Sequence, residues 1–529
     1  MMEQSIFVAI LMITGAYYWF ARLPEWTYYA QRESYQSGGF YRHHFIRAIT
    51  SDHGWQGVVS LVFLFAGLLN WWWMAIPAGF FMILHALYTG KVFRRKVWKV
   101  PLHWTARAWR LAITQGIVLV LEWMILCWWF PAGIMLAVWL SLWNVILALW
   151  LSWPLEWMIQ HQFKHKAKTR LRELQVLHQL RVIGITGSYG KTSSKYILGS
   201  VLSAKFDVLF TPGSFNTPMG ICRVINEQLS GHHEVFVAEM GARHRKDIQE
   251  LVQLVEPSYG LITSVGPAHL ETLGSLDNIA HTKFDLARGV STEGIMVVNG
   301  DNIYCVKEAK TLSRDVLFYG FQAAQHLSAY AEQVCVEDRE TAFTLVLVGD
   351  IKIRCKTRLL GRHNVQNIVG AALLARRMGL SPEELEQGIA SIQPVEHRLQ
   401  LIDPGTGILV IDDAFNSNPE GAAAALEVLS QFSSYRKWIV TPGMVELGSQ
   451  SKEVHRAFGR QIAAVCDEVI LVGKLNTQSL LAGLADAEFP VAQVHTFQSL
   501  GEAQKFLPSL LRAGDVVLFE NDLPDHLEQ

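Results

Sequence analysis

Hydrophobic positions divide the chain into two parts with different periodicity. Up to about residue 153, long apolar runs rich in Trp follow one another, whereas from Arg181 onward short β-rich runs alternate with helical stretches. Long continuous apolar runs are typical of helices that cross a membrane. Short strands alternating with helices are typical of a parallel sheet with crossover helices. The pattern therefore predicts an α/β protein with N-terminal transmembrane helices.

Five apolar runs are candidates for transmembrane helices, and they lie at residues 5–21, 55–73, 74–88, 111–130 and 132–153. No small-residue cleavage site follows the first run, which favours a retained span over a signal peptide. Segments rich in Lys and Arg follow the first, third and fifth runs, and such segments tend to stay on the cytoplasmic side of a membrane. We therefore expect a multi-pass protein of the cell membrane with its N-terminus outside and its catalytic part in the cytoplasm.

One of these runs contains a carboxylate, Glu122. A charged group inside a span is costly unless it is paired or faces a cavity. Two interpretations of Glu122 therefore stay open. It has a functional role, or it is a protonated carboxyl group that only packs against its neighbours.

The rest of the chain reads as a linker and two α/β domains. Residues 161–180 are polar with a helical pattern, which separates a membrane region (1–160) from a globular part. A first domain is expected over residues 181–394, with strands at 182–185, 208–210, 235–238, 261–265 and 295–298 and a hairpin of 343–348 with 351–356. A second, Rossmann-like domain is expected over 395–529, with strands at 408–411, 438–441, 469–472 and 516–519.

Composition removes several function classes. The formal net charge of −1 gives no sign of a nucleic-acid partner. The six cysteines are scattered without a C-x-x-C pair, so neither a disulfide framework nor a zinc site is indicated.

The stretch 181–195, RVIGITGSYGKTSSK, is the strongest chemical signal. A strand that enters a glycine turn and then a helix directs backbone N–H groups and the positive end of the helix dipole at one point, which suits phosphate. Lys191 adds a charge there, and the Thr192 hydroxyl can complete the shell of a Mg²⁺ ion. The spacing departs from the common form because Ile185 stands where a first glycine is expected. An ordinary glycine turn is the alternative, but this pattern predicts an ATP-binding P-loop domain.

Three further residues follow neighbouring strands of the same predicted sheet. Glu239 ends the run VFVAE, at the edge of the sheet where ligands bind. An oxygen ligand for Mg²⁺ is its natural role, and a solvated strand-end carboxylate is the alternative. His269 and Lys283 come after the next strand, and each alone is weak evidence for a site.

Several ordered motifs resemble those of the Mur ligases. They are TGSYGKTS, VAEMGARHRKDI, SVGPAHLETLGSLDNIAHTKFDLA, VVNGDN, GRHNVQN, IDDAFNSNPEG and PGMVELG, and they cover Arg181 to about Gly473. They are most similar to the MurF type, which adds D-alanyl-D-alanine to the UDP-muramoyl tripeptide. The resemblance implies an ADP-forming ligase that phosphorylates a carboxylate and lets an amine attack the acyl phosphate.

The resemblance also implies roles for individual residues. The ATP phosphates would be held by Gly187, Ser188, Gly190, Lys191, Thr192 and Ser193. Two Mg²⁺ ions would be bound by Thr192, Glu239, His269 and Lys283, the last as a carbamylated lysine. Asn299 would lie against the adenine, Arg398 would reach the γ-phosphate, and Asp413 would contact the ribose, with Asn416 nearby. His455 matches a family histidine of open role.

The chain departs from the family at several places. Tyr189 stands where Asn is usual, Pro442-Gly443 replaces Gly-Asp, and Glu520-Asn521-Asp522 replaces Lys-Gly-Ser. The apolar runs occupy the place of the uridine-nucleotide domain. We therefore expect a membrane-anchored ligase that joins an amino acid or peptide to a wall precursor. That precursor is expected to be UDP-linked or lipid-linked. A polymer-forming ligase of the poly-γ-glutamate or cyanophycin type and a nucleotide-binding membrane scaffold are the alternatives.

Overall fold

The chain forms two compact units, Met1–Gln162 and Phe163–Gln529, which are described separately. The structure is a computed structural model, and it describes residues 2–33, 35, 37–41, 75–95, 102–129, 134–268, 270–321, 323–337, 340–414, 419–444, 447 and 450–521.

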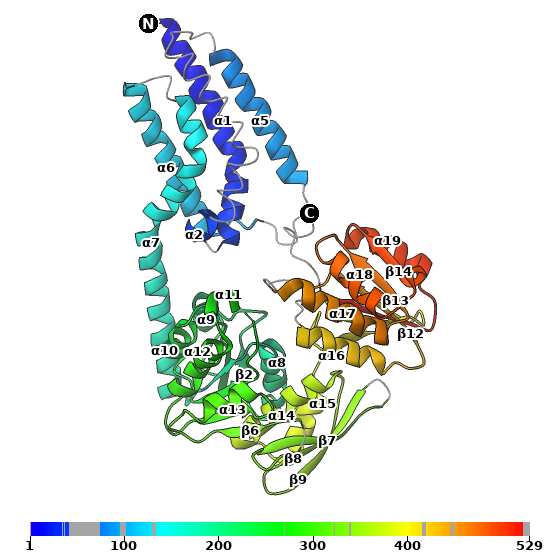
Figure 1. Cartoon of the computed structure of the whole chain (residues 1–529). Helices are drawn as coiled ribbons and strands as arrows, with labels where there is room; N and C mark the ends of the chain where they lie inside the picture. Colours follow the sequence, from blue (N-terminus) through cyan, green and yellow to red (C-terminus); the bar gives the residue numbers. More distant parts are fainter. Residues whose placement is uncertain are drawn as a thin grey trace. The chain divides into compact units, whose positions relative to one another are not determined.

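The first unit is a group of long helices (Figure 1). They are α1 (Met2–Arg32), the short α2 (Ser37–Phe40), α5 (Ala75–Arg95), α6 (Ala106–Trp129) and α7 (Ile134–Leu177), which continues into the second unit. α1 packs against α5 and α6. Buried aromatic side chains, among them Tyr18, Trp26 and Phe40, lie at the centre of this small core.

The predicted transmembrane helices are matched only in part. The runs at 5–21, 74–88, 111–130 and 132–153 fall largely within α1, α5, α6 and α7, and the run at 55–73 lies outside the described residues. Within the described ranges, a single helical stretch, Ala106–Ile125, is long and apolar enough to cross a membrane. Since core helices of soluble proteins pass the same test, the described residues do not support the predicted set of transmembrane helices.

Glu122 has a partner. Its Oε2 accepts a hydrogen bond from Asn144 Nδ2 at 2.7 Å, which links α6 to α7. Asn144 is almost fully buried. The structure therefore gives this carboxyl group a packing contact between helices.

The predicted linker 161–180 packs on the second unit. It is mostly the last part of α7, whose Lys164 Nζ lies 2.5 Å from Glu250 Oε1 of α10 (Asp247–Val255). Lys168 Nζ lies 3.1 Å from Glu256 Oε1 at the end of the same helix. On its inner side, Leu171 is buried in the core of the second unit. Burial of apolar side chains therefore fixes this segment on the second unit, and its basic side chains form ion pairs with glutamates.

A nine-stranded sheet carries the first half of the second unit. Its strands are β1 (Arg181–Thr186), β2 (Val208–Phe210), β3 (Val235–Glu239), β4 (Tyr259–Ile262), β5 (Ile295–Asn299), β6 (Leu317–Tyr319), β7 (Ala329–Glu337), β8 (Glu340–Leu347) and β9 (Ile351–Thr357). The order is β2-β3-β1-β4-β5-β6-β7-β8-β9, parallel as far as β7 and antiparallel beyond it. The predicted strands are confirmed within a few residues, and β6 and β7 are additional.

Helices cover both faces of this sheet (Figure 1). α8 (Lys191–Leu202), α14 (Arg362–Arg377) and α15 (Pro382–Ala390) share one core with it. The other core contains α9 (Pro218–Glu227), α10, α12 (Leu276–Gly289) and α13 (Ile303–Ala309), and the short α11 (Leu270–Leu273) precedes α12.

The predicted hairpin is present as β8 and β9. Gly349 and Asp350 at its turn have φ values of +87° and +55°. Positive φ at two consecutive turn residues matches the right-handed twist of the paired strands. The Gly-Asp pair therefore identified this turn correctly.

A second, six-stranded sheet follows. Its strands are β10 (Gln400–Ile402), β11 (Leu409–Asp413), β12 (Arg436–Thr441), β13 (Glu468–Val472), β14 (Val494–Phe497) and β15 (Asp515–Glu520), in the order β10-β11-β15-β12-β13-β14. Only β10 is antiparallel to its neighbour. Its helices are α16 (Pro419–Ser430), α17 (Ser451–Val465), α18 (Thr477–Asp486) and α19 (Leu500–Leu510), with a 3₁₀ turn at Val491–Gln493.

His455 of α17 forms hydrogen bonds with the segment that follows β12 and with its own helix. Its Nε2 accepts a hydrogen bond from Met444 N at 2.9 Å, and its Nδ1 lies 2.6 Å from Ser451 O, to which it donates. Gly443 has φ +78°, and a Cβ there would lie 2.7 Å from the His455 ring. Burial lowers the pKa of His455. The neutral imidazole therefore fixes the loop that follows β12.

We expect His455→Ala to lower the free energy of unfolding by about 2 kcal/mol, because it removes two hydrogen bonds and leaves a cavity. The pKa of His455 is lower in the folded than in the unfolded state. Its stabilisation is therefore complete above the unfolded value of about 6.5 and is lost as the pH falls toward the folded value. Thermal unfolding at about pH 7.5 and pH 5 checks this, and equal acid destabilisation of wild type and variant would contradict it.

Candidate functional site

The loop between β1 and α8 is built around two glycines. A Cβ on Gly187 would lie 1.9 Å from Thr263 Oγ1, so only glycine lets β1 end against the segment after β4. Gly190 caps α8 in the left-handed region, with φ +77°, which glycine adopts without steric cost. The first N–H groups of α8 are therefore left facing the loop, as an anion-binding helix start requires.

Neighbouring segments hold the loop in shape. Ser188 N donates to Ser264 O at 2.7 Å, and Ser188 Oγ donates to Gly266 O at 3.0 Å. The ring of Tyr189 lies against Gly266, where a Cβ would come within 2.5 Å of Tyr189 Cε2. Tyr189, the departure from the family pattern, thus covers the segment that follows β4.

Lys191 lies over the loop. Its Nζ donates to Gly187 O at 2.8 Å and to Ser188 O at 3.1 Å. Burial lowers its pKa, which Glu239 opposes and Arg398 reinforces. The ammonium is therefore held at the predicted place by carbonyl groups of the loop itself. Ser193, also predicted to bind phosphate, lies partly exposed on the first turn of α8.

Glu239 accepts hydrogen bonds from two side chains of α8 and from Asn216. Its Oε1 accepts from Thr192 Oγ1 and from Asn216 Nδ2, both at 3.2 Å, and its Oε2 accepts from Lys195 Nζ at 3.0 Å. Glu239 is 1% exposed and Lys195 is 0% exposed. Glu239 is thus a buried, fully partnered carboxylate beside the loop, and the alternative of a solvated strand-end residue is wrong.

Lys195 was missed by the sequence analysis. It follows Lys191 by four residues, a spacing that places two side chains on the same face of a helix. Its Nζ also donates to Gly213 O at 2.6 Å. The four-residue spacing from Lys191 was the signal that the sequence offered for Lys195. The burial of the Lys195 side chain depends on the tertiary fold.

Thr192 and Glu239 offer a suitable pair of ligands for Mg²⁺. Both present oxygen atoms, the type of ligand that this ion prefers, and their side chains already touch. The hydroxyl at the helix start and the carboxylate at the strand end therefore fit the predicted first metal position.

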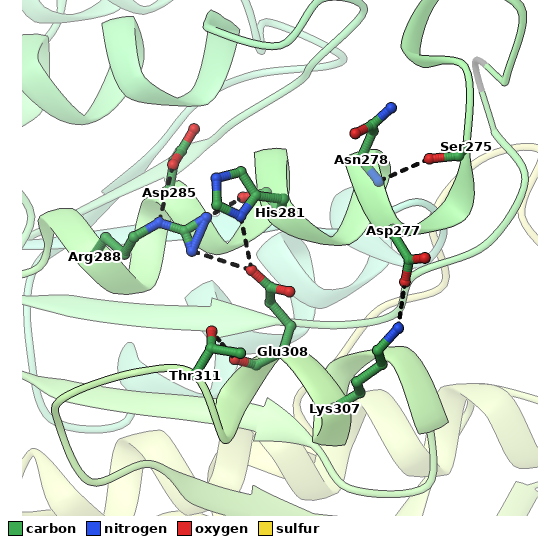
Figure 2. Close-up of polar contacts among 9 residues, drawn as sticks. All are labelled: Ser275, Asp277, Asn278, His281, Asp285, Arg288, Lys307, Glu308 and Thr311. Carbon is green, nitrogen blue, oxygen red and sulfur yellow. Dashed lines mark hydrogen bonds and ion pairs between the residues drawn. The ribbon is translucent and has the colours of Figure 1, made fainter.

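α12 holds Lys283 on its inner side. Ser275 caps the helix by accepting from Asn278 N. On the outer face, His281 Nδ1 lies 3.0 Å and Arg288 Nη1 3.2 Å from Glu308 Oε1 of α13 (Figure 2). These contacts fix the rotation of α12 about its axis, so Lys283 faces inward and is 3% exposed.

Burial, and then the charge of Lys191, lower the pKa of Lys283 well below its ordinary value. Only a neutral amine can react with CO₂ to form a carbamate. A protonated lysine is a poor neighbour for a metal ion, whereas a carbamate offers oxygen ligands. The environment of Lys283 therefore suits the chemistry that the resemblance implies.

The second sheet contributes Arg398 and Asp413. Asp413 ends β11, and its Oδ1 accepts from Leu399 N at 3.2 Å, which fixes the backbone next to Arg398. Burial raises the pKa of Asp413 to about 6. Arg398 interacts electrostatically with both Asp413 and Glu239. The positive charge of Arg398 therefore acts on the phosphate loop.

The other predicted residues have different outcomes. Asn299 is nearly buried, with its Nδ2 donating to Thr263 O at 2.7 Å and its Oδ1 accepting from Asp301 N at 2.9 Å. Its amide therefore braces the strand ends, and contact with adenine stays a prediction. His269 and Asn416 lie outside the described residues.

Comparisons with known proteins identify the family of this chain. The Mur ligase middle domain matches residues 185–375, and the Mur ligase, glutamate ligase domain matches residues 397–520. UDP-N-acetylmuramoyl-tripeptide--D-alanyl-D-alanine ligase of Mycobacterium bovis is 30% identical over 372 residues, which cover 67% of this chain and 72% of that protein. The enzyme of the same name from Bacillus subtilis is 29% identical over 370 residues, or 69% and 77% of the two chains.

Solved structures give the same result. MurF ligase from Thermotoga maritima in complex with ADP has a TM-score of 0.61 at 26% identity, covering 69% of this chain and 82% of that one. MurF from Acinetobacter baumannii has a TM-score of 0.61 at 27% identity, covering 70% and 79%. The chain thus belongs to the Mur ligase family and is an ATP-dependent, ADP-forming ligase similar to MurF.

Proposed function

We propose that this ligase joins D-alanyl-D-alanine, or a similar amine, to the carboxylate of a muramoyl-peptide precursor of the cell wall. The names of the relatives support the choice of substrates. The observation that carries the proposal is the phosphate loop, where Lys191, Thr192 and Glu239 converge. The precursor is linked to UDP or to a lipid.

The reaction joins two anions, because the γ-phosphoryl group of ATP moves to a carboxylate. Catalysis of this step depends on cations around the transferred group more than on a protein nucleophile. Lys191 and Arg398 supply that charge. Thr192, Glu239, His269 and Lys283 would hold the two Mg²⁺ ions, which neutralise phosphate oxygens when bound. The amine then displaces phosphate from the acyl phosphate and forms the amide.

We also propose that the first unit holds the enzyme at the cytoplasmic face of the cell membrane. Large apolar side chains on its helices are exposed, and a contiguous apolar surface of this kind marks a membrane or protein contact. On α6 they recur at helical spacing along one face: Ile113, Ile117, Val120, Leu121, Met124 and Ile125 are all more than half exposed. The basic segments at 91–110 and 164–172 favour a cytoplasmic position for the second unit.

Lys191→Ala should strongly slow the formation of ADP. We expect the rate with UDP-N-acetylmuramoyl-tripeptide and D-alanyl-D-alanine to fall by about 10²–10³-fold, because a cation aimed at the transferred phosphoryl group is lost. Lys310→Ala, which removes an exposed lysine, is the control and should keep full activity. A wild-type enzyme that binds ATP but forms no ADP with any wall-precursor acceptor would refute the proposed reaction. Repeated addition of one amino acid would instead indicate a polymer-forming ligase.

Lys283→Ala should lose activity by about 10²-fold or more, since one anionic metal ligand is removed. Added acetate or propionate should restore part of that activity by placing a carboxylate in the space left by the side chain. Lys307→Ala on the neighbouring helix removes an exposed lysine and should change neither rate nor response to acetate. Full activity of Lys283→Ala without added carboxylate would rule out a carbamate at this position.

Membrane attachment can be measured by fractionation of cells that express the full chain. We expect the protein to sediment with membranes, to stay there in about 1 M salt and at alkaline pH, and to be released by detergent. Salt screens surface charge but leaves apolar contacts in place. Release by salt alone would mean that only the basic segments hold the enzyme at the membrane.

A further inference from the structure

A pocket with one cationic side and one aromatic side lies at one end of the first unit. It has a volume of about 600 Å³ and is formed by residues after α1, by the start of α6 and by the middle of α7. These elements meet near α2 (Figure 1). The residues that decide its chemistry are Tyr35, Arg107, Trp150, Trp153, Glu156 and Trp157.

The cationic side has an excess of positive charge. Arg110 Nε donates to Glu156 Oε1 at 2.5 Å, and Arg107 Nε lies 3.4 Å from Glu156 Oε2. Two guanidinium groups therefore share one carboxylate. Arg107 lines the pocket, and its side chain is 34% exposed. The pocket thus presents a guanidinium that a further anion can reach.

The orientation of Arg107 is fixed before any ligand arrives. Its guanidinium carbon lies 4.3 Å from the centre of the Tyr35 ring. Tyr35 has a φ of +61°, a left-handed conformation that non-glycine residues rarely adopt, and its N–H donates to Ala30 O at 2.7 Å. Such strain persists where the surrounding structure enforces it, and it concentrates at ligand sites.

The aromatic side comes from α7. Trp150, Trp153 and Trp157 recur at helical spacing, and they are 69%, 65% and 57% exposed. Tryptophans of this kind are enriched where a membrane meets water. The apolar stretch Ala106–Ile125 begins at the same pocket, one residue before Arg107. A ligand that fits has an anionic head group and a long apolar chain.

We propose that this pocket binds the diphosphate group of an isoprenoid lipid that carries the wall precursor. The proposal rests on the proposed function and names the form of its acceptor. A diphosphate offers paired oxygens to the planar guanidinium of Arg107, and the chain lies along the three tryptophans. The match to the Mur ligase middle domain begins at residue 185. The proposal therefore assigns recognition of the lipid carrier to the residues before it. α7 connects this pocket directly to the catalytic unit.

The test uses the full-length protein in neutral detergent and radiolabelled geranylgeranyl diphosphate as the probe. Wild type should bind it at least about tenfold more tightly than geranylgeraniol, which lacks the charge, and than inorganic diphosphate, which lacks the chain. Phosphatidylglycerol should displace the probe at least about tenfold less well than unlabelled geranylgeranyl diphosphate. Equal displacement would overturn the carrier as the occupant.

Matched variants separate the two sides of the pocket. Arg107→Gln and Trp153→Ala should each weaken binding about tenfold, while Arg107→Lys should keep part of the affinity because it keeps the charge. Lys166→Gln on an exposed part of α7 and Trp143→Ala outside the pocket are the controls, and both should bind like wild type. Unchanged binding by Arg107→Gln would overturn the proposal. ADP formation with a soluble acceptor is measured in parallel, so failure of the lipid site and failure of the ligase reaction are distinguished.

Discussion

The buried ion pair of Lys195 with Glu239 is the interaction on which the phosphate site depends. Burying a carboxylate to 1% exposure is costly unless its charge is paired and its oxygens are hydrogen-bonded. Lys195, Asn216 and Thr192 meet both conditions. The same contacts tie α8 to the end of β3, so the loop that opens α8 and the carboxylate beside it keep a fixed separation. Breaking such a pair from one side typically costs about 3–5 kcal/mol.

The strand order places this pair at the edge of the sheet where we propose that the nucleotide binds. β1 lies between β3 and β4, both parallel to it, with Ile185 opposite Glu239 in the register. The carboxyl ends of these strands therefore share one edge of the sheet. α8 packs on one face of the sheet and α12 on the other, so the chain segments that follow β1 and β4 diverge to opposite faces. The glycine loop contacts both Glu239 and the residues after β4 at this edge of the sheet.

Sequence reasoning found those parts of the site whose signal is local. The loop at 187–192, Glu239 at a strand end and the Gly-Asp turn are each defined by neighbouring residues. Lys195 was missed because it looks like any helical lysine until the fold buries it. The short strands β6, β10 and β14 were missed since three or four residues carry little periodicity. The segment 161–180 was expected to be a helical linker, and its packing was not predicted, because the burial of Ala167 and Leu171 in the core depends on the tertiary fold.

Positive charge in the site explains how ATP binding can favour the catalytic arrangement. Burial, and then the charge of Arg398, lower the pKa of Lys191. Burial, and then the charge of Lys191, lower the pKa of Lys283. Such repulsion opposes a close approach of the second sheet's Arg398 to the phosphate loop. A triphosphate reverses the sign of the interaction, because each cation then faces an anion. In the proposed reaction, the energy of nucleotide binding would therefore be coupled to the position of Arg398.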